Sequence, residues 1–114
     1  MLYDALRRIF MELDIRSQNL HVDEATESHV QRRMNFALEQ FNSWITRVQV
    51  HLEDVNGPRR GIDKQCRILV NLKGGKTIKV EDLDVDLIAA VNRAADRVGQ
   101  VVSREVDRRR EKKG

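Results

Sequence analysis

The chain of 114 residues lacks several features that are typical of disulfide-rich, disordered or membrane proteins. It has a single cysteine, Cys66, which excludes an internal disulfide and is typical of a protein from a reducing compartment. One proline and six glycines argue against long disordered linkers. No uninterrupted apolar run approaches the roughly 18 residues that a membrane span needs. We therefore predict one soluble, cytoplasmic domain with no membrane partner.

Aromatic residues are also scarce, at 4% of the chain, although 40% of all residues are apolar. Leu, Val and Ile must therefore fill a modest single core. Charge is distributed unevenly: residues 1–86 contain 13 Lys and Arg against 14 Asp and Glu, whereas residues 87–114 contain eight against four. The net charge of +3 thus comes from the last quarter of the chain. Clustered Lys and Arg are the usual footprint of phosphate binding, so nucleic acid is the first partner to consider.

Apolar periodicity predicts the element order strand, helix, three strands, helix. We expect strands at 12–16, 45–53, 65–73 and 76–81, and helices at 23–42 and from about 86 onward. A helix between the first two strands predicts a parallel crossover, and the later strands are expected to be antiparallel neighbours. Each strand has only one apolar face, which places both helices on the same side of a four-stranded sheet. The predicted class is α+β, with the order β-α-β-β-β-α.

Local signals support the ends of these elements. Asp23 is the predicted N-cap of the first helix, and Asp84 or Asp86 is expected to cap the last one. Gly74 and Gly75 predict a hairpin turn between the last two strands. The buried stripe of the first helix is predicted to contain Val30, Met34, Ala37, Leu38 and Phe41.

The last helix carries a stripe of arginines. At 100° per residue, Arg93, Arg97, Arg104 and Arg108 fall within roughly 60° of one another and extend over about 22 Å. Arginine suits bidentate contact with phosphate, so the stripe is a candidate RNA-binding surface. The alternative is a solvated polar face whose arginines form weak ion pairs with neighbouring acidic residues. The opposite face is expected to pack on the sheet through Val91, Ala95, Val98 and Val102.

Catalytic and metal-binding patterns are absent from the sequence. His21, His29 and His51 lie on three different predicted elements and have no cysteine partner, which argues against a metal site. Cys66 falls in the inward register of its strand, where a cysteine behaves as a small apolar residue. No nucleophile, base and orienting group can be assembled. We therefore predict a protein that is not an enzyme and has no cofactor.

Three segments resemble the ribosome hibernation-promoting factor family, which includes the ribosome-associated inhibitor proteins. "LDIRSQNLHVDEA" is similar to the family's first strand, turn and helix cap. "RILVNLKGGKTIKV" resembles its third strand, glycine turn and fourth strand, and "DLIAAVNRAADRVGQVV" resembles its last-helix signature. The similarity covers roughly residues 12–110, and its strength lies in the matching order and spacing of these segments.

The resemblance implies a fold similar to double-stranded-RNA-binding domains and a role in translation regulation under stress and in stationary phase. The implied partner is the small ribosomal subunit with its rRNA, bound in the decoding channel where the protein excludes tRNA and mRNA. Arg97 and Arg104 stand at positions that are basic in the family, and the first helix offers Arg32 and Arg33. Departures from the signature are Ile88, Asn92, Gln100 and Val106, and the later half of the first helix lacks lysines often present there.

The ends of the chain carry separate expectations. Residues 1–10 lie outside the resemblance, either as an N-terminal extension or because translation starts at Met11, which we favour. Residues 11–110 are the predicted ribosome-binding domain, and residues 111–114 are a basic tail. The sequence shows no C-terminal dimerisation domain of the kind found in long family members, so a short, monomeric form is expected.

Two other functions remain open from the sequence. A general structured-RNA-binding domain would also use a basic helix, and a protein–protein adaptor could use the sheet or the acidic segment before the last helix. Salt dependence distinguishes the adaptor from an RNA-binding protein. The affinity for phosphate falls by orders of magnitude between about 50 and 200 mM salt, whereas an adaptor held by apolar contacts should stay bound.

Overall fold

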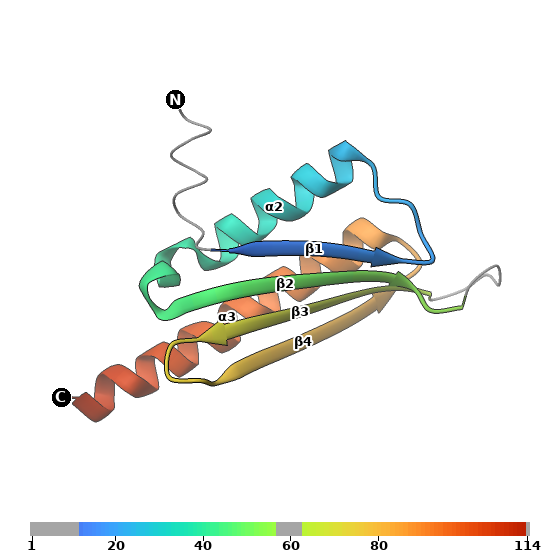
Figure 1. Cartoon of the computed structure of the whole chain (residues 1–114). Helices are drawn as coiled ribbons and strands as arrows, with labels where there is room; N and C mark the ends of the chain where they lie inside the picture. Colours follow the sequence, from blue (N-terminus) through green and yellow to red (C-terminus); the bar gives the residue numbers. More distant parts are fainter. Residues whose placement is uncertain (1–11, 57–62, 114) are drawn as a thin grey trace.

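A computed structural model describes residues 12–56 and 63–113 of the chain (Figure 1). The predicted extension at 1–10 and the start at Met11 lie outside these residues. The elements are β1 (Leu13–Gln18), α2 (Glu24–Leu38), the 3-10 helix η1 (Glu39–Trp44), β2 (Ile45–Asp54), β3 (Lys64–Leu72), β4 (Thr77–Asp84) and α3 (Leu87–Lys113). The predicted α+β class and element order are confirmed.

The four strands form one mixed sheet in the order β1-β2-β3-β4. β1 runs parallel to β2, whereas β2–β3 and β3–β4 are antiparallel. The parallel pair results from the crossover through α2, as the sequence predicted. The register aligns apolar residues across the sheet, in the row Ile15, Val50, Ile68 and Val80.

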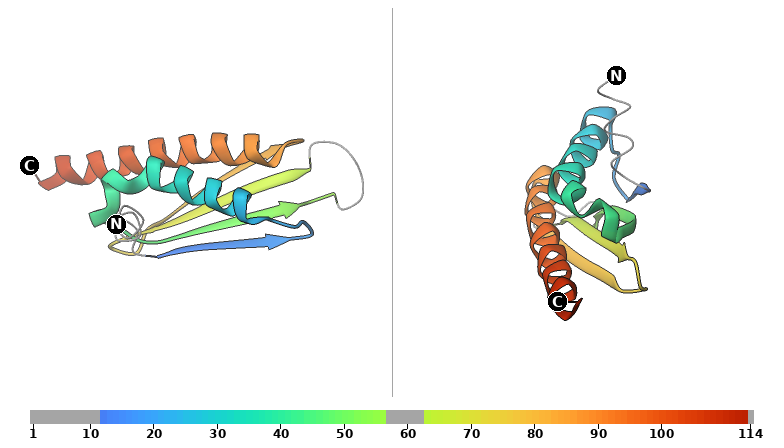
Figure 2. Two further views of the ribbon diagram at one scale, coloured as in Figure 1. Left: turned by 90° about the horizontal axis from the view of Figure 1, so that it is seen from above. Right: turned by 90° about the vertical axis from the view of Figure 1, so that its left-hand side faces the viewer.

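Both helices cover the same face of the sheet and leave the other face open, as the views from above and from the side show (Figure 2). The core lies between these two layers. Its sheet side includes Val48 and Val70, and its helix side includes Met34 and Val102, all with no exposed surface. Burying such a side chain contributes roughly 1.5–3 kcal/mol. The predicted inward residues Val91, Ala95 and Val98 are likewise fully buried.

Helix α2 begins as predicted and ends earlier than predicted. The backbone N–H of Thr26 donates to Asp23 Oδ1 at 2.8 Å, which satisfies one free donor of the first turn. The expected end at residue 42 is wrong, because the α-helix stops at Leu38 and continues as η1. The tighter 3-10 turn brings Phe41 into the core, at 6% exposure, just before the chain enters β2.

Strand β4 is longer than the apolar pattern indicated. The sequence ended this strand at residue 81, but pairing with β3 continues to Asp84, which lies opposite Lys64. Asp82 is therefore a strand residue on the side covered by the helices, two positions after Val80. Asp86 caps α3 as expected, since the N–H of Ile88 donates to Asp86 Oδ1 at 3.0 Å.

Three glycines have a clear structural role, two in a hairpin turn and one between the helices. Gly74 and Gly75 have φ angles of 95° and 98°, a region that side chains disfavour, and they form the predicted hairpin turn. Gly99 lies where α3 crosses α2. A Cβ atom at Gly99 would lie 3.2 Å from the carbonyl oxygen of Ala37, so glycine permits this close approach.

Candidate functional site

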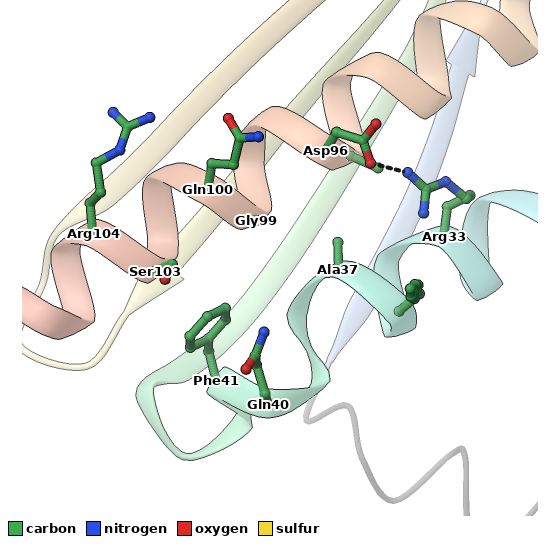
Figure 3. A pocket seen from close by; sticks show the side chains of 11 residues that line it. Arg33, Ala37, Gln40, Phe41, Asp96, Gly99, Gln100, Ser103 and Arg104 are labelled. Atoms are coloured by element: carbon green, nitrogen blue, oxygen red, sulfur yellow. Dashed lines mark hydrogen bonds and ion pairs between the residues drawn. The ribbon is translucent and has the colours of Figure 1, made fainter.

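A groove of about 490 Å³ lies between the two helices. One wall comes from α2 and η1 and the other from α3 (Figure 3). The lining residues are Arg33, Phe36, Ala37, Gln40, Phe41, Ala95, Asp96, Gly99, Gln100, Ser103 and Arg104. The ion pair of Arg33 with Asp96 lies at one end of the groove, and Arg104 lies at the other (Figure 3).

Arg33 joins the two helices through several contacts with α3. Its Nη2 donates to Asp96 Oδ1 at 2.6 Å and to the carbonyl oxygen of Asn92 at 3.2 Å, while its Nε donates to Asn92 Oδ1 at 3.2 Å. His29 Nε2 contacts the same Asn92 oxygen at 2.8 Å. Asn92, a departure from the family signature, thus receives two side chains from α2. The network fixes the width of the groove at this end.

Phe36 is the most exposed large apolar side chain in the described residues, at 67%. The Arg33 guanidinium lies over its ring, 5.9 Å from the centroid. Sequence reasoning assigned Phe36 no role. The available signal was its position outside the buried stripe, because an aromatic residue on the polar side of an amphipathic helix has no packing role there.

The arginines of the predicted stripe differ in their contacts, and two of them, Arg93 and Arg97, form ion pairs with β4. Arg93 donates to Asp82 at 2.9 Å and to Asp84 at 2.7 Å, and these carboxylates raise the pKa of Arg93. Arg97 donates to Asp82 at 3.3 Å and to the carbonyl oxygen of Glu81. Both arginines are therefore tied to β4. Both side chains are still 51% exposed, as the stripe predicted, and their acidic partners lie on β4, which a single-helix wheel does not include.

Glu105 organises the end of α3 nearest the hairpin turn. It is 8% exposed and lies 3.0 Å from Lys76, 3.0 Å from Arg108 and 3.2 Å from Arg109. The hydrogen bond from Lys76, followed by that from Arg109, lowers the pKa of Glu105 despite its burial. Arg109 also donates to the carbonyl oxygen of Lys73 at 2.6 Å. Arg109 is thus held against the hairpin turn, in a helix that continues through residue 113.

Arg32 and Arg104 differ from the other predicted arginines. Both are exposed, and within the described residues neither forms an ion pair or a side-chain hydrogen bond. Arg32 precedes Phe36 by one helical turn, and Arg104 lies at the groove. The RNA-binding role of the six predicted arginines stays a prediction.

The remaining polar residues place further limits on chemistry. Cys66 is buried as predicted, and burial raises the pKa of its thiol to about 12, which keeps it protonated and unreactive. Within residues 12–56 and 63–113, no cluster of three or more His, Cys, Asp or Glu side chains is arranged to hold a metal ion. In the same part of the chain, no helix is long and apolar enough to cross a membrane.

Comparison with known proteins identifies the class to which this β-α-β-β-β-α domain belongs. Residues 13–110 match the family described as sigma 54 modulation protein / S30EA ribosomal protein. This match covers most of the chain, and the protein therefore belongs to that family. The family prediction made from the three sequence segments is confirmed.

Individual relatives agree with this assignment. A ribosome hibernation promotion factor from Picosynechococcus sp. is 26% identical over 90 residues, covering 79% of this chain and 46% of that protein. The chain thus spans about half the length of this curated relative. The N-terminal domain of Protein Y from Thermus thermophilus has a TM-score of 0.65 at 26% identity, with 83% and 96% of the two chains covered. A ribosomal subunit interface protein from Coxiella burnetii has a TM-score of 0.72 at 13% identity, covering 85% and 99%, which shows the common fold.

Proposed function

We propose that this protein is a ribosome hibernation factor that binds the small subunit and blocks its tRNA and mRNA sites. The observation that carries the proposal is the family match over residues 13–110, in a domain whose helical face presents unpaired arginines. The names of the relatives, a hibernation promotion factor and a subunit interface protein, support a ribosomal partner. The protein acts as a cytoplasmic translation inhibitor and stores ribosomes in an inactive form under stress or in stationary phase.

Binding in this proposal requires no catalysis, because an occupied channel excludes tRNA and mRNA sterically. Phosphate contacts from arginine supply most of the affinity and orient the domain on rRNA. Arg32 and Arg104 contribute most, since neither forms an ion pair with another residue that the structure describes. Arg33, Arg93 and Arg97 contribute less per residue, because each already donates to aspartate.

The proposed partner can be tested by cosedimentation. We expect the protein to sediment with purified small subunits and not with large subunits, and to be displaced when mRNA and tRNA are bound beforehand. Excess double-stranded RNA serves as the competitor that reveals a general structured-RNA binder. Equal binding to both subunits, or loss of subunit binding to the competitor, would favour that alternative. Binding that persists beside mRNA and tRNA would contradict the blocking mechanism.

A further inference from the structure

We infer that the groove between α2 and α3 is a nucleotide subsite, in which an unpaired RNA base stacks on Phe36 and Arg104 contacts a neighbouring phosphate. The inference rests on the proposed function and names the part of the RNA that this face recognises. Its ligand class is an unstacked nucleotide in single-stranded RNA, as found in loops and bulges.

The exposed ring of Phe36 is the first reason. An aromatic side chain that leaves 67% of its surface in water gains little from the fold, and it is available to a partner. Arg33 lies over the ring at 5.9 Å and restricts its position through a cation–π contact. Bases stack on such rings irrespective of their sequence, and one stacked base strengthens binding by roughly 5- to 150-fold.

The polar lining of the groove is the second reason. Gln40 and Gln100 project from opposite walls, with Ser103 beside them (Figure 3). Among the described residues, none of these three side chains forms a hydrogen bond. Each amide offers two N–H donors and a carbonyl acceptor, which are the groups that pair with the edge of an unstacked base.

Charge distinguishes a nucleotide from an apolar partner. The described lining residues include two guanidiniums, Arg33 and Arg104, and one carboxylate, Asp96. Asp96 is neutralised by Arg33 at 2.6 Å, which leaves the charge of Arg104 available at the other end of the groove. Phe41 on the same wall is only 6% exposed, so Phe36 is not part of a continuous apolar stripe of the kind that would hold an amphipathic helix. One aromatic platform with free amides and a free arginine fits a nucleotide.

The groove is also held in shape before any ligand binds. Gly99 lets α3 lie against Ala37, and the contacts of Arg33 with Asn92 and Asp96 connect the two walls. These contacts set the spacing of the two helices, so ligand binding does not depend on a large movement of the groove walls.

Fluorescence anisotropy with defined RNA tests the inference. The probes are labelled ten-nucleotide oligoadenosine and oligouridine, each compared with an abasic oligonucleotide that keeps every phosphate. We expect Phe36→Leu to weaken binding to the intact probes by about 5- to 100-fold and to leave abasic binding unchanged. Phe36→Trp should preserve affinity, and Arg104→Gln should weaken binding to both kinds of probe. Val85→Ala, which alters another apolar side chain at 63% exposure, is the matched control.

The outcomes separate this inference from the proposed function. Thermal midpoints of all variants are measured first, so that a loss of folding is not mistaken for a loss of binding. One outcome overturns the nucleotide subsite alone: wild-type protein binds small subunits, but Phe36→Leu binds intact RNA as tightly as wild type. The groove would then be a candidate site for a protein partner. An equal loss on intact and abasic probes also overturns base stacking. Wild-type protein that fails to bind small subunits contradicts the proposed function, whatever the oligonucleotides show.

Discussion

His51 lies on the open face of the sheet, directly opposite Arg16 of β1 and Arg67 of β3. Burial, followed by the charges of Arg67 and Arg16, lowers the pKa of His51 below its usual value of 6.5. Glu53 lines a shallow pocket together with His51, Arg16 and Arg67, and Glu81 of β4 lies opposite Arg67. Burial and the two guanidiniums are therefore the causes of the lowered pKa of His51.

This arrangement predicts an acid-sensitive contribution to stability. The folded protein binds a proton at His51 less readily than the unfolded chain does, so the free energy of unfolding falls as the pH drops through 6.5 and below. His51→Gln should therefore reduce the drop in thermal midpoint between pH 7.5 and pH 5, with His21→Gln, on an exposed side chain before α2, as control. An unchanged drop in the His51 variant, measured by circular dichroism, would show that this residue does not cause it.

At the residue scale, the sequence predicted which face of a helix each residue occupies better than it predicted the partners of the charged side chains. A helical wheel correctly separates the arginine stripe from Val91, Ala95, Val98 and Val102, because these positions depend only on the geometry of one helix. The acidic partners of Arg93 and Arg97 lie on β4, and no single-helix pattern can show them. Phe36 was missed for a different reason. Its exposed ring becomes a candidate contact only because α3 forms the opposite wall of a groove, and the sequence does not show that groove.

At the scale of elements, β4 and α3 are joined by an ionic cluster. Asp82 lies on the helix-covered side of the sheet with a side chain only 9% exposed, and it receives both Arg93 and Arg97. Asp84 accepts from Arg93 and also from the backbone N–H of Asp86 at the start of α3. The cluster thus fixes where α3 begins relative to the last strand.

The cluster predicts that two arginines of the same stripe have different effects on stability. Arg93→Gln leaves Asp84 without its guanidinium and Asp82 with one instead of two, so the thermal midpoint should fall. Arg104→Gln is the matched control, and its free energy of unfolding should change by no more than about 0.5 kcal/mol, as at ordinary surface positions. Equal midpoints for the two variants in a thermal melt would contradict a structural role for Arg93.

The elements themselves were largely predictable, and the exceptions have physical causes. The alternation of apolar and polar residues predicted β2 and β3, because each strand has one face in the core. The pattern ended β4 too early, since Asp82 occupies an inward position that only its arginine partners make tolerable. The end of α2 at Leu38 was not visible in the sequence, because Phe41 keeps the apolar spacing of the helix although it belongs to η1.

At the scale of the whole molecule, the two faces of the sheet differ, because both helices cover one of them (Figure 2). The helical layer contains the groove, the exposed arginines Arg32 and Arg104, and the contacts that connect α2 with α3. The sequence indicated a basic helix and the family, but two of the four arginines in its predicted stripe, Arg93 and Arg97, form ion pairs with β4. Fewer phosphates are therefore expected to be bound by α3 than the four-arginine stripe suggested.

The central claim, that this helical face binds rRNA phosphates of the small subunit, is tested most directly by the salt dependence of binding. Cosedimentation with small subunits is measured between 50 and 200 mM salt, roughly the range in which phosphate contacts weaken most visibly. The variant replaces Arg32 and Arg104 by Gln together, and Phe36→Leu, which changes no charge, is the control. The double variant should flatten the slope of log affinity against log salt by about 1.4 to 1.8, whereas the control should keep the wild-type slope. A folded double variant with wild-type affinity and slope would contradict the claim.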